Sequence, residues 1–178
     1  MKITKATLPK DSILSGGEYG YVDSFQVKYE DAGDCISSQD IGKAFFTSAP
    51  SWVAGLFELR NRIVSVFGLK TSGKVENREE LFKNFQCEPG EKLGLFRVYH
   101  RDKNEVILGE DDQHLNFRVS LLKEDFPHDP QLKTLTMSTS VQFHNWLGRL
   151  YFLPVKPFHK LIAPTMLKGI VRQLGSSQ

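Results

Sequence analysis

The 178-residue sequence contains only two cysteines, Cys35 and Cys87, and neither has a second cysteine nearby. They therefore form neither a disulfide framework nor a C-x-x-C motif for a metal or a redox reaction. The sequence also lacks a run of about 18 apolar residues, which a membrane-spanning helix needs, and its N-terminus has no apolar core of a secretory signal. We therefore expect a reduced, cytoplasmic protein without a membrane span.

Several motifs that define common enzyme classes are also missing. The glycine-rich stretch SGGEYG has neither the G-x-G-x-x-G pattern of dinucleotide-binding proteins nor the lysine of a phosphate-binding loop. No G-x-S-x-G elbow or H-E-x-x-H motif occurs, and the five histidines do not have the spacing of metal ligands. A net charge of +2 without a concentrated basic face is not typical of nucleic-acid-binding proteins. We therefore expect no metal, no cofactor and no nucleic-acid partner.

The composition, 40% hydrophobic and 25% charged, is that of an ordinary globular protein, and the length suits one domain over residues 1–178. Residues 21–30 alternate between two sides and predict a half-buried strand. Ser37, with Asp40 three residues later, resembles a capping box and predicts the start of a short helix.

A second helix is predicted from Pro50 to Gly68, with most of its apolar side chains on one arc. Residues 71–91 show no clean period and indicate a loop or an irregular strand. Four strands are then expected, over residues 93–100, 105–109, 113–122 and 132–145. Because the strands are grouped rather than alternating with helices, the sequence predicts an α+β fold with an antiparallel sheet.

The last segment, residues 155–174, predicts a helix with a conflict inside it. Before Pro164 the apolar residues form one arc, and after it they form another that points nearly the opposite way on an ideal helix. Because proline removes an interior hydrogen bond, we expect a kink or a break near residues 160–164. The alternative is a first half that is buried on both sides.

Three blocks of the sequence resemble the signature blocks of a known family: APSWVAGLFELRNRIVSVFGLK, LGEDDQHLNFRVSLL and HNWLGRLYFLPVKPFHKLI. The chain is similar, over roughly residues 8–172, to an uncharacterised bacterial family, domain of unknown function 2867, whose members resemble the START-type, helix-grip (SRPBCC) superfamily. The resemblance implies a curved antiparallel β-sheet wrapped around a long C-terminal helix, with two short helices after the first strand and a cavity between sheet and helix. It implies no catalytic residues, and Pro164 departs from a helix that is continuous in other members.

The stretch ILGEDDQHLNFRVSLL concentrates polar side chains in one predicted strand. Alternation places His114 and Arg118 on one face and Phe117 and Val119 on the other, and the next strand has the same split, with His144 on its polar face. We interpret the polar face as the solvated outer side of a half-buried sheet. The alternative is a polar patch in which the two histidines exchange protons with an acid of the preceding turn near neutral pH.

Arg60 and His159 are polar residues in apolar helical surroundings. Arg60 falls inside the apolar arc of the second helix, where it either extends its head to water or anchors an anionic group of a ligand. His159 is expected to be a cap or a hydrogen-bonded packing residue. Four aromatic residues are expected to belong to the core: Trp52, Trp146, Tyr151 and Phe152. If a ligand binds, the candidate contacts are Arg60, Trp52, His114, Arg118, His144, Phe158 and His159.

These observations favour a non-catalytic protein that binds a small apolar or amphipathic molecule between the sheet and the C-terminal helix. One alternative is an enzyme of the cyclase or hydratase kind, in which pocket histidines or carboxylates perform acid–base chemistry, and another is an interaction module without a ligand. Residues 145–178 contain five lysines and arginines and no acids. We interpret them as the solvated side of an amphipathic helix and do not expect membrane contact. The sequence leaves the oligomeric state open.

Overall fold

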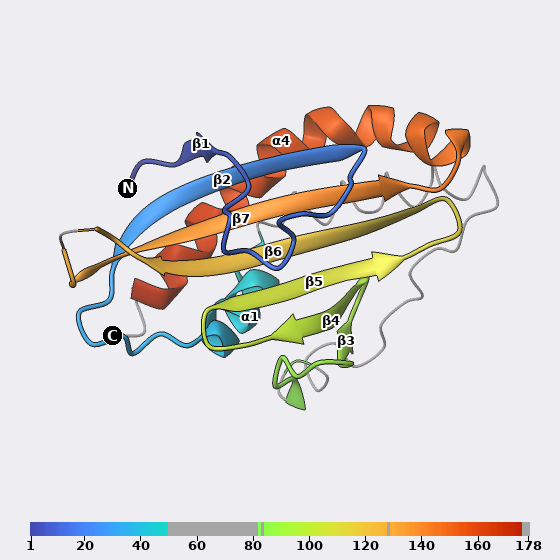
Figure 1. The fold of residues 1–178 in the computed structure, drawn as a ribbon. Helices are drawn as coiled ribbons and strands as arrows, with labels where there is room; N and C mark the ends of the chain where they lie inside the picture. The colour runs from blue at the N-terminus through green and yellow to red at the C-terminus, as the bar shows by residue number, and fades with distance from the viewer. Residues whose placement is uncertain (50–81, 83, 128, 176–178) are drawn as a thin grey trace.

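The computed structural model describes residues 1–49, 82, 84–127 and 129–175. The predicted second helix, with Trp52 and Arg60, lies outside the described residues. The described part combines one antiparallel sheet with a long C-terminal helix, which confirms the predicted α+β class (Figure 1).

Seven strands form the sheet (Figure 1). They are β1 (Thr4–Ala6), β2 (Tyr21–Glu30), β3 (Lys92–Leu93), β4 (Phe96–Arg101), β5 (Glu105–Asp111), β6 (Leu115–Asp125) and β7 (Leu132–Phe143). Their order in space is β1-β2-β7-β6-β5-β4-β3, so that β2 and β7 are neighbours although most of the chain separates them. The strands predicted over residues 21–30, 105–109, 113–122 and 132–145 are confirmed as β2, β5, β6 and β7. The strand predicted over residues 93–100 is divided by a turn at residues 94–95 into β3 and β4, and the short edge strand β1 was not predicted.

Helix α1 (Ser38–Thr47) follows β2 and begins with the predicted capping box. The Ser37 hydroxyl accepts a hydrogen bond from the Asp40 backbone N–H at 3.2 Å, and the Asp40 carboxylate accepts one from the Ser37 N–H at 3.0 Å. These reciprocal bonds satisfy N–H groups that a helix start leaves free. Ile41 and Phe45, four residues apart, are buried in the core, so the cap sets where the helix starts and the apolar spacing sets which side faces the sheet.

Helix α4 (Trp146–Gly175) begins nearer the N-terminus than the predicted residue 155. At its start the Asn145 side chain accepts a hydrogen bond from the Gly148 N–H at 3.1 Å. Asparagine is among the preferred residues before a helix because it satisfies such a free N–H group. The helix therefore starts directly after β7, with two residues between them.

Three prolines lie inside α4 without ending it: Pro154, Pro157 and Pro164. Each removes a hydrogen bond to the carbonyl four residues before it, which belongs to Leu150, Leu153 or Lys160. All three of these residues are exposed, so water can bond the freed carbonyls. Of the predicted kink or break near residues 160–164, the break is therefore wrong, and Figure 1 shows one helix that bends as it passes along the sheet. A first half buried on both sides is also wrong, because Leu153 is exposed.

Helices α1 and α4 contact each other and pack on the same side of the sheet, which we call the helix-facing side. The core lies there, and its buried members include Val27, Leu121, Leu135, Leu167 and Ile170. On β6, Val119 is buried in this core and Phe117 packs against it. Alternation therefore directs Arg118 to the opposite, outer side of the sheet.

The N-terminal segment, residues 7–20, crosses the outer side of the sheet (Figure 1). The Ser12 hydroxyl donates a hydrogen bond to Glu105 at 2.6 Å, and the Ile13 N–H donates one to the same carboxylate at 2.9 Å. Ser120, on the polar face of β6, also donates to Glu105 and is buried under this segment. The predicted solvated outer face is therefore wrong for the middle of the sheet, because the chain itself covers it.

Candidate functional site

Arg118, a predicted ligand contact, lies on the outer side of the sheet and has partners there. Its guanidinium lies over the Tyr99 ring, 3.6 Å from the centroid, and forms an ion pair with Asp111 at 2.6 Å. It also donates hydrogen bonds to the backbone carbonyls of Glu110 and Phe117. These contacts tie β6 to β4 and β5, and they hold the arginine away from the helix-facing side.

The two histidines of the predicted polar patch lie where the β5–β6 turn meets the start of α4. The Asn145 amide nitrogen lies 3.0 Å from His114 Nδ1, and the His144 backbone N–H donates to the His114 carbonyl at 2.9 Å. His114 is half-buried, whereas His144 is exposed. Gly148 permits this approach, because a Cβ there would lie 2.1 Å from the His114 carbonyl oxygen. The structure thus brings the two histidines together at a helix start.

Asp23, on the helix-facing side of β2, is held between a tyrosine and a histidine. The Tyr21 hydroxyl donates to Asp23 Oδ2 at 2.6 Å, and His159 Nε2 lies 3.0 Å from Oδ1. Asp23 is only 8% exposed, and His159 reaches it from the inner side of α4, while the neighbouring Phe158 is exposed. We call Tyr21, Asp23 and His159 the polar trio. The prediction that His159 is a hydrogen-bonded packing residue is confirmed, whereas its partner Asp23 was not predicted.

Burial and charge act in opposite directions on the acid of the polar trio. Burial raises the pKa of Asp23, but the hydrogen bond and charge of His159, the Tyr21 hydroxyl and the charge of Lys160 outweigh it, so that its pKa lies below the usual value. Burial, and then the hydrogen bond and charge of Asp23, raise the pKa of Tyr21. At neutral pH the trio therefore contains an ionised carboxylate and a neutral phenol that donates to it.

The polar trio borders an apolar wall between the sheet and α4. The Tyr21 ring lies 4.8 Å from the ring of Phe152, which lies 5.5 Å from the ring of Phe143. Leu115 and Val141 are buried in the same cluster. Polar and apolar surfaces therefore meet at one place on the helix-facing side.

Thr139 adds a further hydroxyl beside the polar trio. It pairs directly with Asp23 of β2 and with Val119 of β6, so the three residues form one row across the sheet. Thr139 is 5% exposed, and its Oγ1 has no hydrogen-bond partner among the described residues. Because buried polar atoms are normally paired, this hydroxyl is a candidate for a contact with a ligand.

The sequence contains a signal for this site. In the alternation of residues 21–30, Asp23 falls on the same side as Phe25 and Val27, and Val27 is buried in the core. A carboxylate on the apolar side of a strand requires partners, because an unpaired buried charge is costly. That position, rather than the polar stretch of β6, identifies the buried site.

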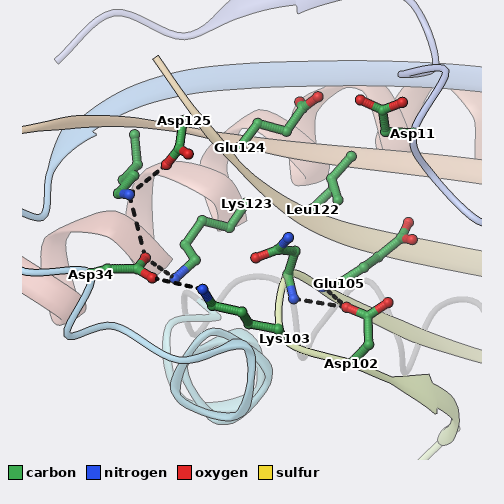
Figure 2. Close-up of a pocket in the computed structure, with 11 residues that line it drawn as sticks. Asp11, Asp34, Asp102, Lys103, Glu105, Leu122, Lys123, Glu124 and Asp125 are labelled. Carbon is green, nitrogen blue, oxygen red and sulfur yellow. Dashed lines mark hydrogen bonds and ion pairs between the residues drawn. The ribbon is translucent and has the colours of Figure 1, made fainter. Parts of the chain in front are cut away.

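A second candidate is a pocket of about 460 Å³ at the far end of β6 (Figure 2). Figure 2 shows Lys103 and Lys123 converging on Asp34. The Lys123 Nζ lies 2.7 Å from both Asp34 Oδ1 and the Ile36 carbonyl oxygen. The hydrogen bond from Lys123 is the main cause that lowers the pKa of Asp34. These contacts fasten the segment after β2 to the end of the sheet.

The other lining residues of this pocket are also mostly charged. Lys133 Nζ lies 2.5 Å from Asp125, and burial, followed by the charges of Asp11 and Glu105, raises the pKa of Glu124. The lining contains six acids and three lysines, so its formal charge is negative. Such a surface does not suit the apolar or amphipathic ligand that the sequence predicts.

The described fold is thus an α+β domain in which a long C-terminal helix packs on one side of an antiparallel sheet and covers a polar trio whose acid is buried. The chain belongs to the family described as "Protein of unknown function (DUF2867)", whose model matches residues 16–166. That range includes every residue of the polar trio and Thr139. No curated protein and no solved structure matches the chain.

Proposed function

We propose that this protein binds a small amphipathic molecule between the helix-facing side of the sheet and α4, in the manner of a START-type, helix-grip domain. The proposal rests on one observation: the buried Asp23 carboxylate lies beside Thr139, and the Thr139 hydroxyl has no hydrogen-bond partner among the described residues. Small-molecule sites are mostly apolar, with a few polar groups that fix the orientation of the ligand. The polar trio and its aromatic wall have this composition.

The negative charge of Asp23 indicates which head group the ligand carries. An ionised carboxylate accepts hydrogen bonds but donates none, so the matching head group carries a hydroxyl or an amine. Thr139 can donate or accept, which suits a hydroxyl well. The apolar body of the ligand would lie against Tyr21, Phe143 and Phe152. Arg60 and Trp52, outside the described residues, stay predicted contacts.

A second candidate function is an enzyme of the cyclase or hydratase kind. The hydrogen bond between His159 and Asp23 favours it, because a carboxylate that holds one nitrogen of an imidazole ring orients the other for proton transfer. In this enzyme, His159 would perform the acid–base chemistry that the sequence assigned to His114 and His144, because those two histidines lie at the start of α4.

Native mass spectrometry of the full chain, followed by extraction of bound small molecules, tests the binding proposal. We expect an alcohol or amine with an apolar body to co-purify with the wild type and to be lost from Asp23→Asn, which keeps the shape but removes the charge. The control Asp111→Asn makes the same change on the outer side, beside Arg118, and is expected to retain the ligand. The proposal is refuted if nothing co-purifies in repeated preparations and no long-chain alcohol or amine raises the melting temperature.

His159→Gln separates the binder from the enzyme. Glutamine can still donate a hydrogen bond to Asp23, but it does not exchange protons near neutral pH. A binder returns the same molecule unchanged from the wild type and from the variant. An enzyme converts the bound molecule in the wild type, whereas the variant retains it unconverted. Recovery of unaltered ligand from the wild type after prolonged incubation counts against the enzyme.

A further inference from the structure

The outward side of α4 carries large apolar side chains in water. Trp146 is 69% exposed, so the prediction that it belongs to the core is wrong. Leu150 is 44% exposed, Leu153 65% and Leu161 63%. At 3.6 residues per turn these four residues fall within an arc of about 80°, along about 22 Å of the helix. We call them the apolar stripe. Exposed apolar surface of this kind marks a contact site rather than a contribution to the core.

Cations flank the apolar stripe along one edge. Arg149, Lys156 and Lys160 are exposed, and the helical period places them together beside the stripe. Arg149 and Lys156 lie 5.4 Å and 5.3 Å from the rings of Phe143 and Tyr21, so this exposed edge lies between the stripe and the sheet. The sequence of α4 contains no aspartate or glutamate. The stripe and its edge therefore form an apolar surface with charge of one sign.

The sequence alone gave no expectation of membrane contact, but the exposed apolar stripe changes this, and we propose that it docks on an anionic lipid membrane with α4 lying parallel to the membrane plane. Tryptophan is favoured at the boundary between lipid and water, and leucines on one face of a helix insert into that boundary. Lysine and arginine along the edge contact anionic head groups. None of the helices that the structure describes has the length and apolar character to cross a membrane.

A second copy of the chain is the competing occupant of the apolar stripe. In a symmetric contact between two copies of α4, the cations of both copies would come close together, and α4 supplies no acid to neutralise them. An anionic membrane neutralises the same cations. Charge complementarity therefore favours the membrane.

Docking does not depend on the proposed ligand. His159, which contacts Asp23, lies on the inner side of α4, whereas Leu153 and Leu161 lie on the outer side. The two proposals can therefore be tested separately with variants of different residues.

Co-sedimentation of the full chain with vesicles tests the docking proposal. We expect binding to vesicles of phosphatidylcholine mixed with phosphatidylglycerol, and binding about tenfold weaker or more to phosphatidylcholine alone, because each cation near an anionic surface adds to the affinity. Added salt should reduce binding, since exposed charges are screened.

Two double variants and one matched control locate the contact. Leu153→Gln with Leu161→Gln removes apolar surface, and Lys156→Gln with Lys160→Gln removes charge. Each pair is expected to weaken binding to the mixed vesicles by roughly tenfold or more. The control, Lys10→Gln with Arg97→Gln, removes the same charge from exposed positions outside α4 and should bind as the wild type does.

Several results would overturn the docking proposal. They are an absence of wild-type binding to the mixed vesicles, equal binding to neutral vesicles, and wild-type affinity in the leucine variant. Light scattering that shows a dimer abolished by the leucine substitutions, without vesicle binding, would assign the apolar stripe to a second copy instead. A blue shift of tryptophan emission on mixed vesicles, lost in Trp146→Phe, gives a readout that requires no leucine variant.

Discussion

In the ion pair between Asp34 and Lys123, we expect replacement of the more exposed partner, Asp34, to cost more unfolding free energy than replacement of Lys123. The Lys123 side chain is 4% exposed, whereas that of Asp34 is 36% exposed. Lys123 donates to the Asp34 carboxylate and to the Ile36 carbonyl, each at 2.7 Å. Asp34→Asn removes the charge but keeps the shape, and asparagine tolerates the positive φ of 51° at this position. We expect it to destabilise the fold more than Lys123→Met does.

The expected losses in unfolding free energy depend on which charge a substitution leaves without a counter-ion. Removing one partner of a fully buried ion pair costs about 3–5 kcal/mol, because the other charge stays buried without a counter-ion. Because water partly screens Asp34, we expect Asp34→Asn to cost about 2 kcal/mol. Lys123→Met leaves no charge without a counter-ion, because Lys133 and Lys103 still lie 3.4 Å from Asp34. It loses the hydrogen bonds to Asp34 and Ile36, and leaving the Ile36 carbonyl unpaired costs about 1 kcal/mol. The double variant should cost about as much as Lys123→Met alone.

The effect of Asp34→Asn should also depend on pH. In the folded protein the pKa of Asp34 is lowered, chiefly by the hydrogen bond from Lys123, relative to an unfolded value of about 3.9. A lowered folded-state pKa stabilises the protein above the unfolded pKa, and this stabilisation is lost as the pH falls toward the folded pKa. The difference in unfolding free energy between wild type and variant should therefore be constant near neutral pH and shrink below about pH 4.

Urea titrations of the wild type, both single variants and the double variant measure these differences at several pH values. The reasoning is refuted if Lys123→Met costs as much as Asp34→Asn. It is also refuted if the two single costs simply add in the double variant, because additivity would mean that neither charge depends on the other.

Two further predictions concern close packing and thiol chemistry. Gly148→Ala should destabilise by about 2–3 kcal/mol, because the added Cβ would lie 2.1 Å from the His114 carbonyl oxygen, whereas Gly175→Ala has nothing within 4 Å and should be nearly neutral. Equal melting temperatures for the two variants would contradict this. Burial raises the pKa of the Cys87 thiol to about 12, and Cys35 is exposed, so a disulfide reagent should modify Cys35 alone in the folded protein. Both thiols should react in denaturant, and rapid reaction of both in native buffer would refute the prediction.

The features that could be predicted from the sequence depend on neighbouring residues. The capping box of Ser37 and Asp40 needs only a spacing of three, and the strand over residues 21–30 needs only alternation. Alternation also separates Arg118 from Phe117 and Val119, although it cannot say which face meets the helices. The structure places Phe117 and Val119 there.

The features that escaped prediction depend on contacts between distant parts of the chain. Asp23 and His159 are 136 positions apart, and Ser12 and Glu105 are 93 apart. Such pairs follow from the neighbouring positions of β2 and β7 and from the path of the N-terminal segment, and a single sequence specifies neither the pairing nor the register. The site was therefore missed although His159 was a candidate, because its partner could not be located.

The conflict between the two apolar arcs of the last helix has a physical explanation in α4. Opposing arcs on an unbroken helix mean that apolar side chains occupy two sides of it, and only the side with His159 packs on the sheet. A fully buried leucine contributes about 1.5–3 kcal/mol to folding, but Leu153 and Leu161 are mostly exposed and contribute little. Their apolar character therefore needs a reason other than stability, and contact with a membrane supplies one. Since the two sides use different residues, Leu153→Gln should leave ligand retention unchanged, and Asp23→Asn should leave vesicle binding unchanged.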